Sequence, residues 1–386
     1  MTGAAPPGAV PPVGAGDGAA RVAVVVPNFN KAKTLRACLE SVLGQSLAPV
    51  EVVVVDDAST DGSREIVAEF PVRLVVQSVN RGPAAARNVG VASCSAPLVF
   101  FVDSDTALAS DAIEAAVGIL RGGVGVGMVQ GIYAPEPLFD DGPVEAYRVA
   151  FEHFWRRRTV GRETGALFAA TLVPREVFTA TGGFDERLRD GEDDEFGTRL
   201  PARYRLVATD RVTTRHDDVD RLAPLLREQY VRARTKPALM VRTRRRQRGG
   251  AVTGERADLM STGRYRRLDR DAQLSLVTSA LALLVLPVAV FVPAAASAWP
   301  VLVAGFVAAN AEFLRLAYRL RGAGFALTAA GLHLLSHTAL VAGLVAGLPR
   351  AAVALLRDVA VVNRRSSAAD AAQTTEKRVH AQADRS

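Results

Sequence analysis

The sequence predicts an α/β fold with a mainly parallel sheet, followed by an apolar C-terminal region that crosses a membrane. From Arg21 onward, short runs of Val alternate with stretches that carry apolar residues at helical spacing. Continuous Val strands separated by helices are typical of parallel sheets buried on both faces. After Leu274 the chain contains long apolar runs, and arginines gather beside them. Parallel α/β sheets bind ligands at the carboxyl ends of their strands, so we expect functional residues to follow the strands.

The expected strands and helices alternate along the chain from residue 22. In the first helix, Leu35, Leu39 and Val42 share one face, as expected for a helix that packs on a sheet. The predicted strands are Val22–Val26, Val52–Val55, Leu74–Val76 and Leu98–Val102, and the predicted helices are Lys31–Leu43, Ser63–Phe70 and Ala84–Ala92.

Composition excludes several classes of protein. The chain of 386 residues is 49% hydrophobic and 23% charged, which is too apolar for a disordered chain. Cys38 and Cys94 are the two cysteines, too few for a disulfide scaffold or a four-cysteine zinc site. Aromatic residues make up 6%, which argues against a stacking platform for nucleic acid. The net charge of +7 comes with arginines beside the apolar tail, a pattern typical of the cytoplasmic edge of a membrane.

Polar residues follow the first two predicted strands. Strand one runs into the turn Pro27–Asn30, which exposes the ring of Phe29, and strand two ends in Asp56-Asp57. Asp61 is interpreted as a helix N-cap. For Asp57 we favour a binding role, because two adjacent carboxylates repel each other unless a cation or a hydrogen-bond donor is near. A nucleotide base offers such a donor.

The fourth strand ends in Asp103-Ser104-Asp105. If the extended conformation continues, Asp103 and Asp105 point to the same side, because side chains alternate along a strand. Two converging carboxylates suit a hard cation such as Mg²⁺ or Mn²⁺, which also takes phosphate oxygens. A lone Asp-x-Asp is common in ordinary loops, but its position directly after a Val/Phe strand favours the metal site.

The order of these motifs resembles that of family 2 inverting glycosyltransferases with a GT-A fold. The resemblance covers roughly residues 21–235 and rests on six motifs in the right order. They are Val24–Asn30, Val52–Gly62, Asn80–Gly90 (Asn80-Arg81-Gly82 through Ala86-Arg87-Asn88-Val89-Gly90), Phe101–Asp105, Gly182–Glu186 and Gly191–Asp193.

The resemblance implies a donor site for a nucleoside-diphosphate sugar. Pro27, Phe29 and Asp57 would line the nucleotide pocket, with Phe29 in place of the more common Tyr. Arg87 would approach the nucleotide, while Asn88 would serve local structure. Asp103 and Asp105 would bind the sugar nucleotide through Mg²⁺ or Mn²⁺, with Asp105 the more direct ligand, and His216 would approach the metal or the diphosphate.

The resemblance also implies a catalytic base, Asp193, with Glu192 as its neighbour. The ordinary interpretation is that these acids precede a short helix, Phe196–Leu200, whose dipole favours them. An inverting transfer is one displacement, so one carboxylate deprotonates the acceptor hydroxyl opposite the departing nucleotide. We therefore expect the two acidic sites to approach the sugar from opposite ends.

Other residues keep two interpretations. Arg199 matches a common family position, but it is equally explained as a partner of Glu195 on the same helix. Trp155 would face the acceptor or pack in the core. Gly165–Thr171 would form part of the acceptor wall, although it lacks the Asn that often follows Gly in the family. The chain has no Gln-x-x-Arg-Trp motif of polymer-extruding synthases, since Gln229–Arg232 matches it only in part, so we expect single-sugar transfer.

Three apolar runs are each about long enough to cross a hydrocarbon core of roughly 30 Å. Buried helices of a soluble domain are the alternative. Arginines at 264–270 precede the first run and those at 315–321 end the second, which puts both clusters inside. The arginines at 350–365 disagree with the outside terminus that three spans imply. The runs are Leu274–Phe291, Trp299–Tyr318 and Phe325–Leu348, and Ala351–Val362 is expected to be an interfacial helix.

These interpretations combine into five expected segments: a disordered tail (1–20), a glycosyltransferase domain (21–235), a basic juxtamembrane linker (236–273), a transmembrane region (274–348) and an interfacial helix with a polar tail (349–386). The expected function is transfer of a sugar to an acceptor, such as a polyprenyl phosphate or glycolipid of the cell envelope, at the cytoplasmic face of the cell membrane. No nucleic-acid partner is expected. The alternatives are a nucleotidyltransferase, which would need a basic phosphate-binding loop after strand one, and a catalytically silent nucleotide-binding membrane scaffold.

Overall fold

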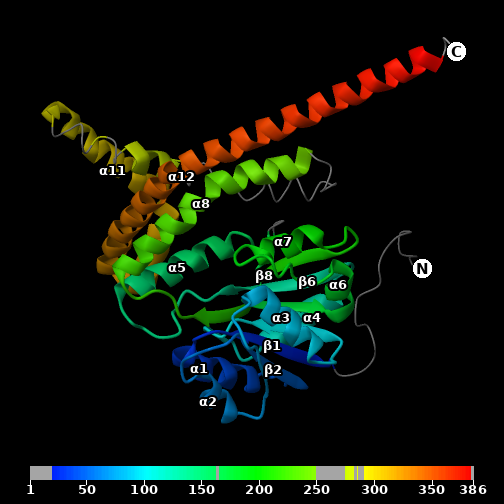
Figure 1. The fold of residues 1–386 in the computed structure, drawn as a ribbon. Helices are drawn as coiled ribbons and strands as arrows, with labels where there is room; N and C mark the ends of the chain where they lie inside the picture. The colour runs from blue at the N-terminus through cyan, green and yellow to red at the C-terminus, as the bar shows by residue number, and fades with distance from the viewer. Residues whose placement is uncertain (1–19, 162–164, 249–273, 282–284, 286–290, 384–386) are drawn as a thin grey trace, which may run out of the picture. The chain divides into compact units, whose positions relative to one another are not determined.

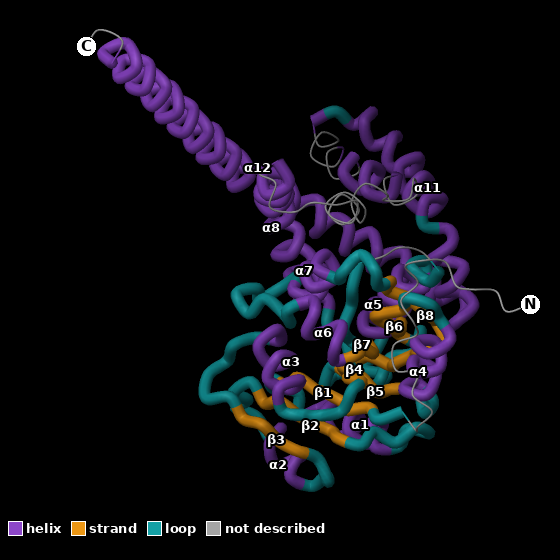
Figure 2. Tube along the Cα trace, turned by 90° about the vertical axis from the view of Figure 1, so that its right-hand side faces the viewer, coloured by secondary structure: helices purple, strands orange, loops and turns teal. Residues whose placement is uncertain are grey.

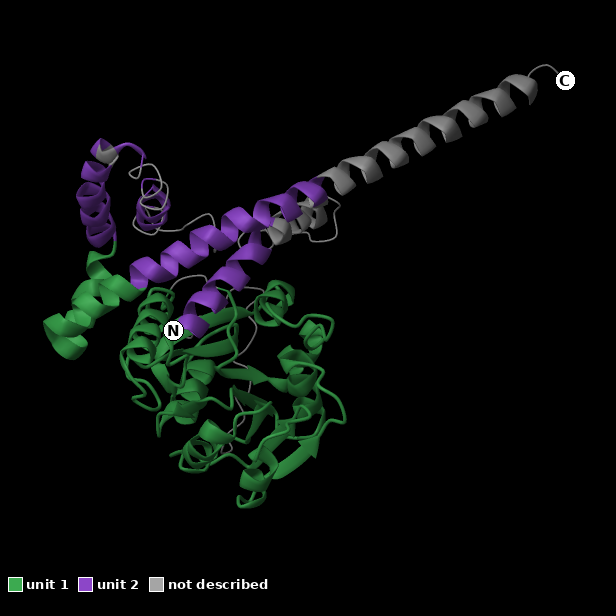
Figure 3. Ribbon diagram, turned by 60° about the vertical axis from the view of Figure 1, so that its left-hand side comes forward, with its two compact units in different colours: residues 1–222, 258–268, 310–332 green, residues 223–257, 269–309, 333–386 purple. Residues whose placement is uncertain are grey.

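The computed structural model describes residues 20–161, 165–248, 274–281, 285 and 291–383. They fall into two compact units, coloured separately in Figure 3. The first includes the described residues up to 222 and residues 310–332. The second includes the described parts of 223–257, 269–309 and 333–386. Residues 1–19 of the predicted tail and residues 249–273 of the predicted linker lie outside the described residues.

An eight-stranded sheet forms the centre of the first unit (Figures 1 and 2), with strand order β3-β2-β1-β4-β7-β6-β8-β5. Strands β3, β2, β1 and β4 run parallel, as does the pair β6 and β8. Strand β7 is antiparallel to both of its neighbours. The prediction of a mainly parallel sheet is confirmed. The strands are β1 Val22–Asn28, β2 Glu51–Asp56, β3 Arg73–Val76, β4 Leu98–Val102, β5 Thr106–Leu108, β6 Val126–Tyr133, β7 Ala170–Pro174 and β8 Arg205–His216.

Helices cover both faces of this sheet. Successive side chains of a strand point to opposite sides, so a strand of apolar residues contributes to a buried cluster on each face. Val24 of β1 belongs to a buried cluster with Leu39 and Ile113, on α1 and α4. Val25, the next residue, belongs to a second cluster with residues of α3, α6 and α7, including Phe196. The helices of this unit are α1 Ala32–Leu43, α2 Ser63–Ala68, α3 Pro83–Ala92, α4 Ala112–Gly122, α5 Pro143–Arg157, α6 Arg175–Thr181 and α7 Glu192–Arg199.

Three local expectations differ from the structure. Helix α7 begins at Glu192 rather than at Phe196, so the acidic residues form its first turn, where the helix dipole favours them. A short strand is expected at Leu206–Ala208, followed by a polar loop, but β8 continues from Arg205 to His216 because it pairs with β6 and then with β5. The extended conformation of β4 stops at Val102, and the chain then turns, with the Thr106 amide donating to the Asp103 carbonyl at 3.1 Å.

The Gly-Gly motif has a backbone reason. Gly182 and Gly183, after α6, both have positive φ, at 85° and 67°. Both amides donate to the Phe178 carbonyl, at 3.1 and 3.2 Å, which satisfies the free end of the helix. Residues with a side chain rarely adopt this conformation, so two glycines in sequence mark the turn that directs the chain toward α7.

The C-terminal part is helical and differs in one place from the predicted spans. The predicted span Trp299–Tyr318 is not one helix: α11 ends at Ala309, and α12 starts at Ala311. Asn310 between them accepts a hydrogen bond from the Leu314 amide, which is the position of a helix N-cap. The predicted span Leu274–Phe291 lies partly outside the described residues. The elements are α8 Leu222–Arg248, a 3₁₀ turn Pro293–Ser297, α11 Ala298–Ala309 and α12 Ala311–Ala383.

Among the described helices, one stretch is long and apolar enough to cross a membrane. It is Ala311–Val353 of α12, with a mean hydropathy of 1.5. Gly322 interrupts its helical geometry, with φ 80° and ψ −173°. The predicted span Phe325–Leu348 lies inside this stretch, and α12 continues through the predicted interfacial helix at 351–362.

Candidate active site

The loops that follow β1 and β2 brace each other. The side-chain amide of Asn28 donates to Asp56 and to Ser59, both at 3.2 Å. The Thr60 amide donates to the Asn30 side chain at 2.8 Å. Asn30 and Ala58 both have positive φ, at 52° and 63°. Such strain persists only where surrounding contacts hold it, so these hydrogen bonds impose a defined shape on the turn.

The two predicted pocket residues of the first turn lie at its surface. Phe29 is 44% exposed, so it is accessible to a ligand. Pro27 is half-buried at the end of β1. The predicted stacking role of Phe29 is compatible with this exposure and stays a prediction.

Asp57 is buried and holds a loop of the protein. Its carboxylate accepts hydrogen bonds from the side chain of Gln77 at 2.9 Å and from the amides of Arg81 and Gly82, both at 2.7 Å. The protein itself therefore supplies three hydrogen-bond donors to this carboxylate, so the repulsion between Asp56 and Asp57 does not by itself require a nucleotide base. A nucleotide contact by Asp57 stays a prediction.

Asn88 has the structural role that the sequence indicates, whereas Asp61 lies one residue before Gly62, the N-cap of α2, and yet binds the first amide of that helix. Asp61 accepts the Ser63 amide at 3.0 Å and the Ala32 amide at 2.9 Å, at the starts of α2 and α1. The Asn88 side chain exchanges hydrogen bonds with the backbone of Phe184, at 2.9 and 3.0 Å. It therefore fixes the loop that follows the Gly-Gly turn.

The buried guanidinium of Arg87 pairs with three other predicted site residues. We call these four residues the Arg87 cluster: Arg87, Asp103, Glu192 and Asp193. Arg87 donates to Asp103 at 2.9 Å, to Glu192 at 2.8 Å and to Asp193 at 3.0 Å. Its side chain is 4% exposed. Arg87 thus pairs with a member of each of the two acidic sites, and their approach to the sugar from opposite ends stays a prediction.

The rings of Phe168 and Phe184 complete the surroundings of Arg87, with centroids 5.7 and 5.4 Å from the guanidinium carbon. These rings belong to a buried group of phenylalanines between the sheet and α6 and α7. A planar cation suits such a site, because it stacks on rings and pairs with carboxylates in its plane. Arg87 pairs with these carboxylates, and its expected approach to a nucleotide stays a prediction.

Asp193 has the properties of a general base. The protein packed around it, with Glu192 and Asp103 adding to the effect against the opposing charge of Arg87, raises the pKa of Asp193 to about 7. One oxygen accepts the Phe168 amide at 3.1 Å, which orients the carboxylate. Its side chain is still 24% exposed. A base with a pKa near the working pH and an open face is suited to accept a proton from a hydroxyl group.

A second group of charges, the Asp105 cluster, consists of Asp105, Lys31 and His216. The Lys31 ammonium lies 2.7 Å from one carboxylate oxygen of Asp105. The Nε2 of His216 lies 3.7 Å from the other oxygen. Burial would raise the pKa of Asp105, but His216 and Lys31 outweigh it and hold this pKa below its ordinary value. Asp103 and Asp105 were expected to converge, but they pair with different cations. The chain turns after Val102, and Asp103 pairs with Arg87 whereas Asp105 pairs with Lys31.

Stacked side chains hold His216 in place. Its ring stacks on Tyr133, with centroids 4.4 Å apart and planes 5° apart. The guanidinium of Arg156 lies 3.8 Å from the centroid of the Tyr133 ring. His216 Nδ1 lies 3.6 Å from Asp218, beyond hydrogen-bond distance. An oriented imidazole beside a carboxylate is a donor set that fits a divalent cation.

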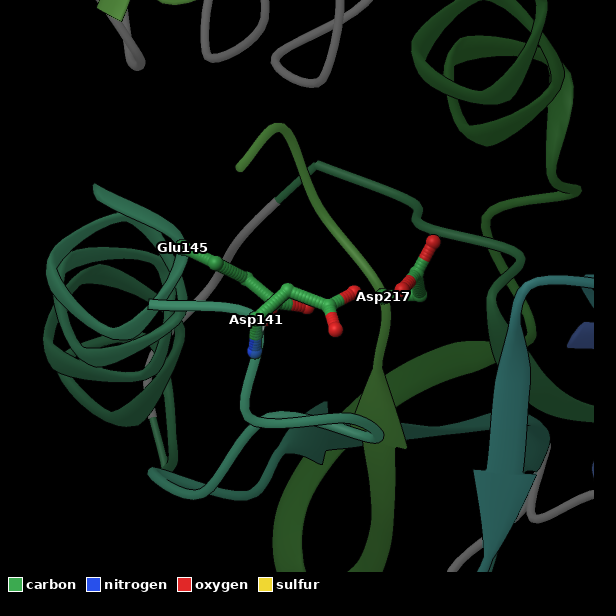
Figure 4. Close-up of side chains that lie close together, drawn as sticks. All are labelled: Asp141, Glu145 and Asp217. Carbon is green, nitrogen blue, oxygen red and sulfur yellow. Dashed lines mark hydrogen bonds between the residues drawn. The ribbon is translucent and has the colours of Figure 1, made fainter. Parts of the chain in front are cut away.

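Sequence reasoning missed a further acidic group near this cluster (Figure 4). Asp141, Glu145 and Asp217 have carboxylate oxygens within 4.8 Å of one another. The Lys33 ammonium lies between two of them, 2.5 Å from Asp141 and 2.6 Å from Asp217. Glu145 accepts the Asp141 amide at 2.9 Å, so it also serves the start of α5. A search for carboxylates at helix starts would have found Glu145 but not its approach to Asp217.

The remaining expectations are resolved in part. Arg199 pairs with Glu195 through two 2.7 Å hydrogen bonds, which confirms the intrahelical interpretation. Trp155 packs edge-on against Phe151, with centroids 6.1 Å apart. Of the predicted acceptor wall, Phe168 contacts Asp193 through its amide. Lys31 was missed, although a cation directly after the Pro27–Asn30 turn was a visible signal.

Known proteins resemble this chain most clearly over the first part of the sheet domain. Residues 23–179 match the family model for glycosyl transferase family 2. The chain is 41% identical over 98 residues to the glycosyltransferase GlyA of Streptococcus pneumoniae, covering 24% of this chain and 14% of that protein. It is 28% identical over 180 residues to the glycosyltransferase AglE of Haloferax volcanii, covering 45% of this chain and 58% of that protein. The matches thus span less than two thirds of these relatives.

Several solved structures match over most of the chain, and one of them has a TM-score above 0.5. It is the mannosyltransferase PcManGT from Pyrobaculum calidifontis in complex with GDP-Man and Mn²⁺, with a TM-score of 0.51 at 22% identity, covering 85% of this chain and 87% of that one. At this identity the likeness concerns the fold. The motifs, the sheet and the family match lead to one conclusion: this chain carries a family 2 glycosyltransferase domain with the GT-A fold.

Proposed function

We propose that this protein transfers a sugar from a nucleoside diphosphate to an acceptor hydroxyl by one inverting displacement. The observation that carries the proposal is the Arg87 cluster, in which a partly exposed Asp193 with a pKa of about 7 lies beside the end of β4. Family 2 membership and the donor named for PcManGT support the same class of reaction.

Each residue has a defined task in this proposal. Asp193 accepts the proton of the acceptor hydroxyl, and Phe168 N and Arg87 hold its carboxylate in one orientation. Glu192 and Asp103 bind the same guanidinium and thereby keep its position. Arg87 pairs with the negative charge that would otherwise accumulate between the three acids.

The donor is proposed to bind across the ends of β1, β2 and β4. Phe29 and Pro27 would contact the base, and the loop held by Asp57 would close the pocket beside it. Asp105 and His216 would hold a divalent cation, Mg²⁺ or Mn²⁺, with Asp103 nearby. When bound, that cation neutralises the charge of the departing diphosphate.

A membrane-linked acceptor is also proposed, such as a polyprenyl phosphate or a glycolipid. The apolar stretch Ala311–Val353 supports attachment to a membrane. The arginines at 242–248 and 264–270 favour the cytoplasmic leaflet, where each basic residue near anionic lipid contributes about 1 kcal/mol. The catalytic domain would then face the cytoplasm.

A donor panel tests the proposal. The full chain in detergent is heated with UDP- and GDP-sugars in the presence of Mn²⁺, and the donor that raises the melting temperature most is then supplied with a polyprenyl phosphate. We expect sugar transfer with release of the nucleoside diphosphate. Release of pyrophosphate from a nucleoside triphosphate and a sugar phosphate would favour a nucleotidyltransferase. Donor binding with neither reaction would favour the silent scaffold.

A further inference from the structure

Lys31 lies where a cation is expected beside Asp105. Its ammonium is 2.7 Å from one Asp105 oxygen, and the other oxygen faces His216 Nε2 at 3.7 Å. Asp105, which would bind a metal together with His216, is therefore already paired with the Lys31 ammonium. Lys31 follows directly after the Pro27–Asn30 turn, in the donor site itself.

The backbone of Lys31 is fixed independently of its side chain. Its amide donates to Ser63 Oγ at 3.3 Å, and its carbonyl accepts the Leu35 amide at 2.9 Å in the first turn of α1. Thr34 Oγ1 then donates to the Ser104 carbonyl at 2.8 Å, which ties this turn to the one that carries Asp105. Replacing the Lys31 side chain therefore leaves these contacts in place.

The side chain, in contrast, is able to leave. It is 40% exposed, and the ammonium sits on four flexible methylene groups. Burial lowers the pKa of Lys31, but the charges of Asp105, Asp217 and Asp103 outweigh this and raise it overall. The ammonium thus remains charged, and the carboxylate that holds it would also attract a divalent cation.

We propose that Lys31 is an exchangeable counter-ion of the donor site. Its ammonium neutralises Asp105 when no donor is bound, a divalent cation displaces it, and the released ammonium then pairs with the diphosphate that the cation brings. This inference rests on the proposed donor site, but it concerns a residue outside the predicted metal and base residues.

Metal binding without any sugar nucleotide tests the inference. Binding of Mn²⁺ alone to the full chain is followed by the loss of the free Mn²⁺ signal in electron paramagnetic resonance. We expect Lys31→Met to bind Mn²⁺ on the order of tenfold more tightly than wild type, equivalent to about 1.4 kcal/mol. Lys31→Arg, which keeps the positive charge, should bind close to wild type. If Lys31 had only a structural role, replacing it with Met would not raise the affinity for Mn²⁺.

Arg36→Met is the matched control, since Arg36 lies five residues away and pairs with the exposed Glu69, outside the Asp105 cluster and outside the group of Asp141, Glu145 and Asp217. An equal rise in Arg36→Met would reveal a general effect of net charge and overturn the inference. Equal or weaker Mn²⁺ binding by Lys31→Met overturns it as well, as does absence of Mn²⁺ binding in all variants. Melting temperatures close to wild type verify that each variant is folded.

Inorganic pyrophosphate tests the second half. At saturating Mn²⁺, we expect Lys31→Met to bind pyrophosphate several-fold more weakly, because a charge-assisted hydrogen bond is lost. Unchanged affinity overturns the contact with the diphosphate. Neither measurement uses a sugar donor, so failure of the donor panel leaves both results interpretable, and failure here leaves sugar transfer open.

Discussion

The Arg87 cluster contains Asp103 and the Asp105 cluster contains Asp105, only two residues further along the chain. The two clusters nevertheless use different cations in different surroundings. Arg87 is 4% exposed and pairs with three carboxylates at once. Lys31 is 40% exposed and is held mainly by one. A guanidinium binds several carboxylates in a fixed plane, whereas an ammonium is a compact charge on a flexible stem.

The difference separates a permanent charge pair from one that can exchange. Removing one partner of a buried ion pair leaves an uncompensated charge in a low-dielectric site, which is strongly unfavourable. Removing a partly exposed partner leaves a charge that water can solvate. We therefore expect the Arg87 cluster to determine the free energy of unfolding and the protonation of Asp193. We expect the Asp105 cluster to determine the affinity for metal and donor.

The largest effect is expected for Arg87. Arg87→Met should lower the free energy of unfolding by about 3–5 kcal/mol, because three acids lose their common counter-charge. Arg87→Lys should recover part of this loss, since one ammonium cannot reproduce the planar fork. Thermal unfolding of the full chain in detergent measures the change.

Arg187→Met is the matched control for this prediction. Arg187 pairs with Asp185, but its side chain is 86% exposed. Its loss should leave the melting temperature close to that of wild type. Similar melting temperatures for the Arg87 and Arg187 variants would contradict the assignment of Arg87 as a permanent, buried counter-ion.

The next effect concerns Asp193. Asp193→Asn should lower the transfer rate by on the order of a hundredfold, as expected when a general base is lost, with donor and metal binding nearly unchanged. In wild type the rate should rise as the pH passes through about 7, because only the deprotonated carboxylate accepts the proton. Initial rates over a pH series measure both, and the Asn variant should lose this rise.

Asp190→Asn is the control for Asp193→Asn. Asp190 is exposed and precedes the same helix, so its removal changes the net charge equally without touching the Arg87 cluster. A wild-type rate in Asp193→Asn, or an equal loss in both variants, would reject Asp193 as the base.

The smallest effect on stability is expected for Asp105. Asp105→Asn should lower the free energy of unfolding less than Arg87→Met does, because the Lys31 ammonium that it leaves behind is 40% exposed and can be solvated by water. Its affinity for donor in the presence of Mn²⁺ should nevertheless fall on the order of tenfold or more, because a charged metal ligand is lost. Calorimetric titration of the donor, with and without Mn²⁺, measures this. Unchanged metal dependence would remove Asp105 from the proposed metal site.

The first half of the sheet could be predicted from the sequence because its signals are local. Buried parallel strands need continuous Val runs, and β1, β2 and β4 have them. The Gly182-Gly183 turn likewise follows from backbone sterics. Strand β7 was not predicted, since its place between β4 and β6 depends on pairing with distant segments. The start of α7 was misplaced because acidic residues can either precede a helix or form its first turn.

The sequence by itself therefore determined the class of fold, the order of the strand-end motifs and the family to which they belong. The tertiary structure alone decided which charges meet. Arg87 reaches Glu192 across 105 residues of chain, and Lys31 reaches Asp105 across 74. Propensity and periodicity act over a few residues, whereas the energy of a charge depends on its distance to other charges and on how far water is excluded. Those two quantities exist only once the sheet has brought the ends of its strands together.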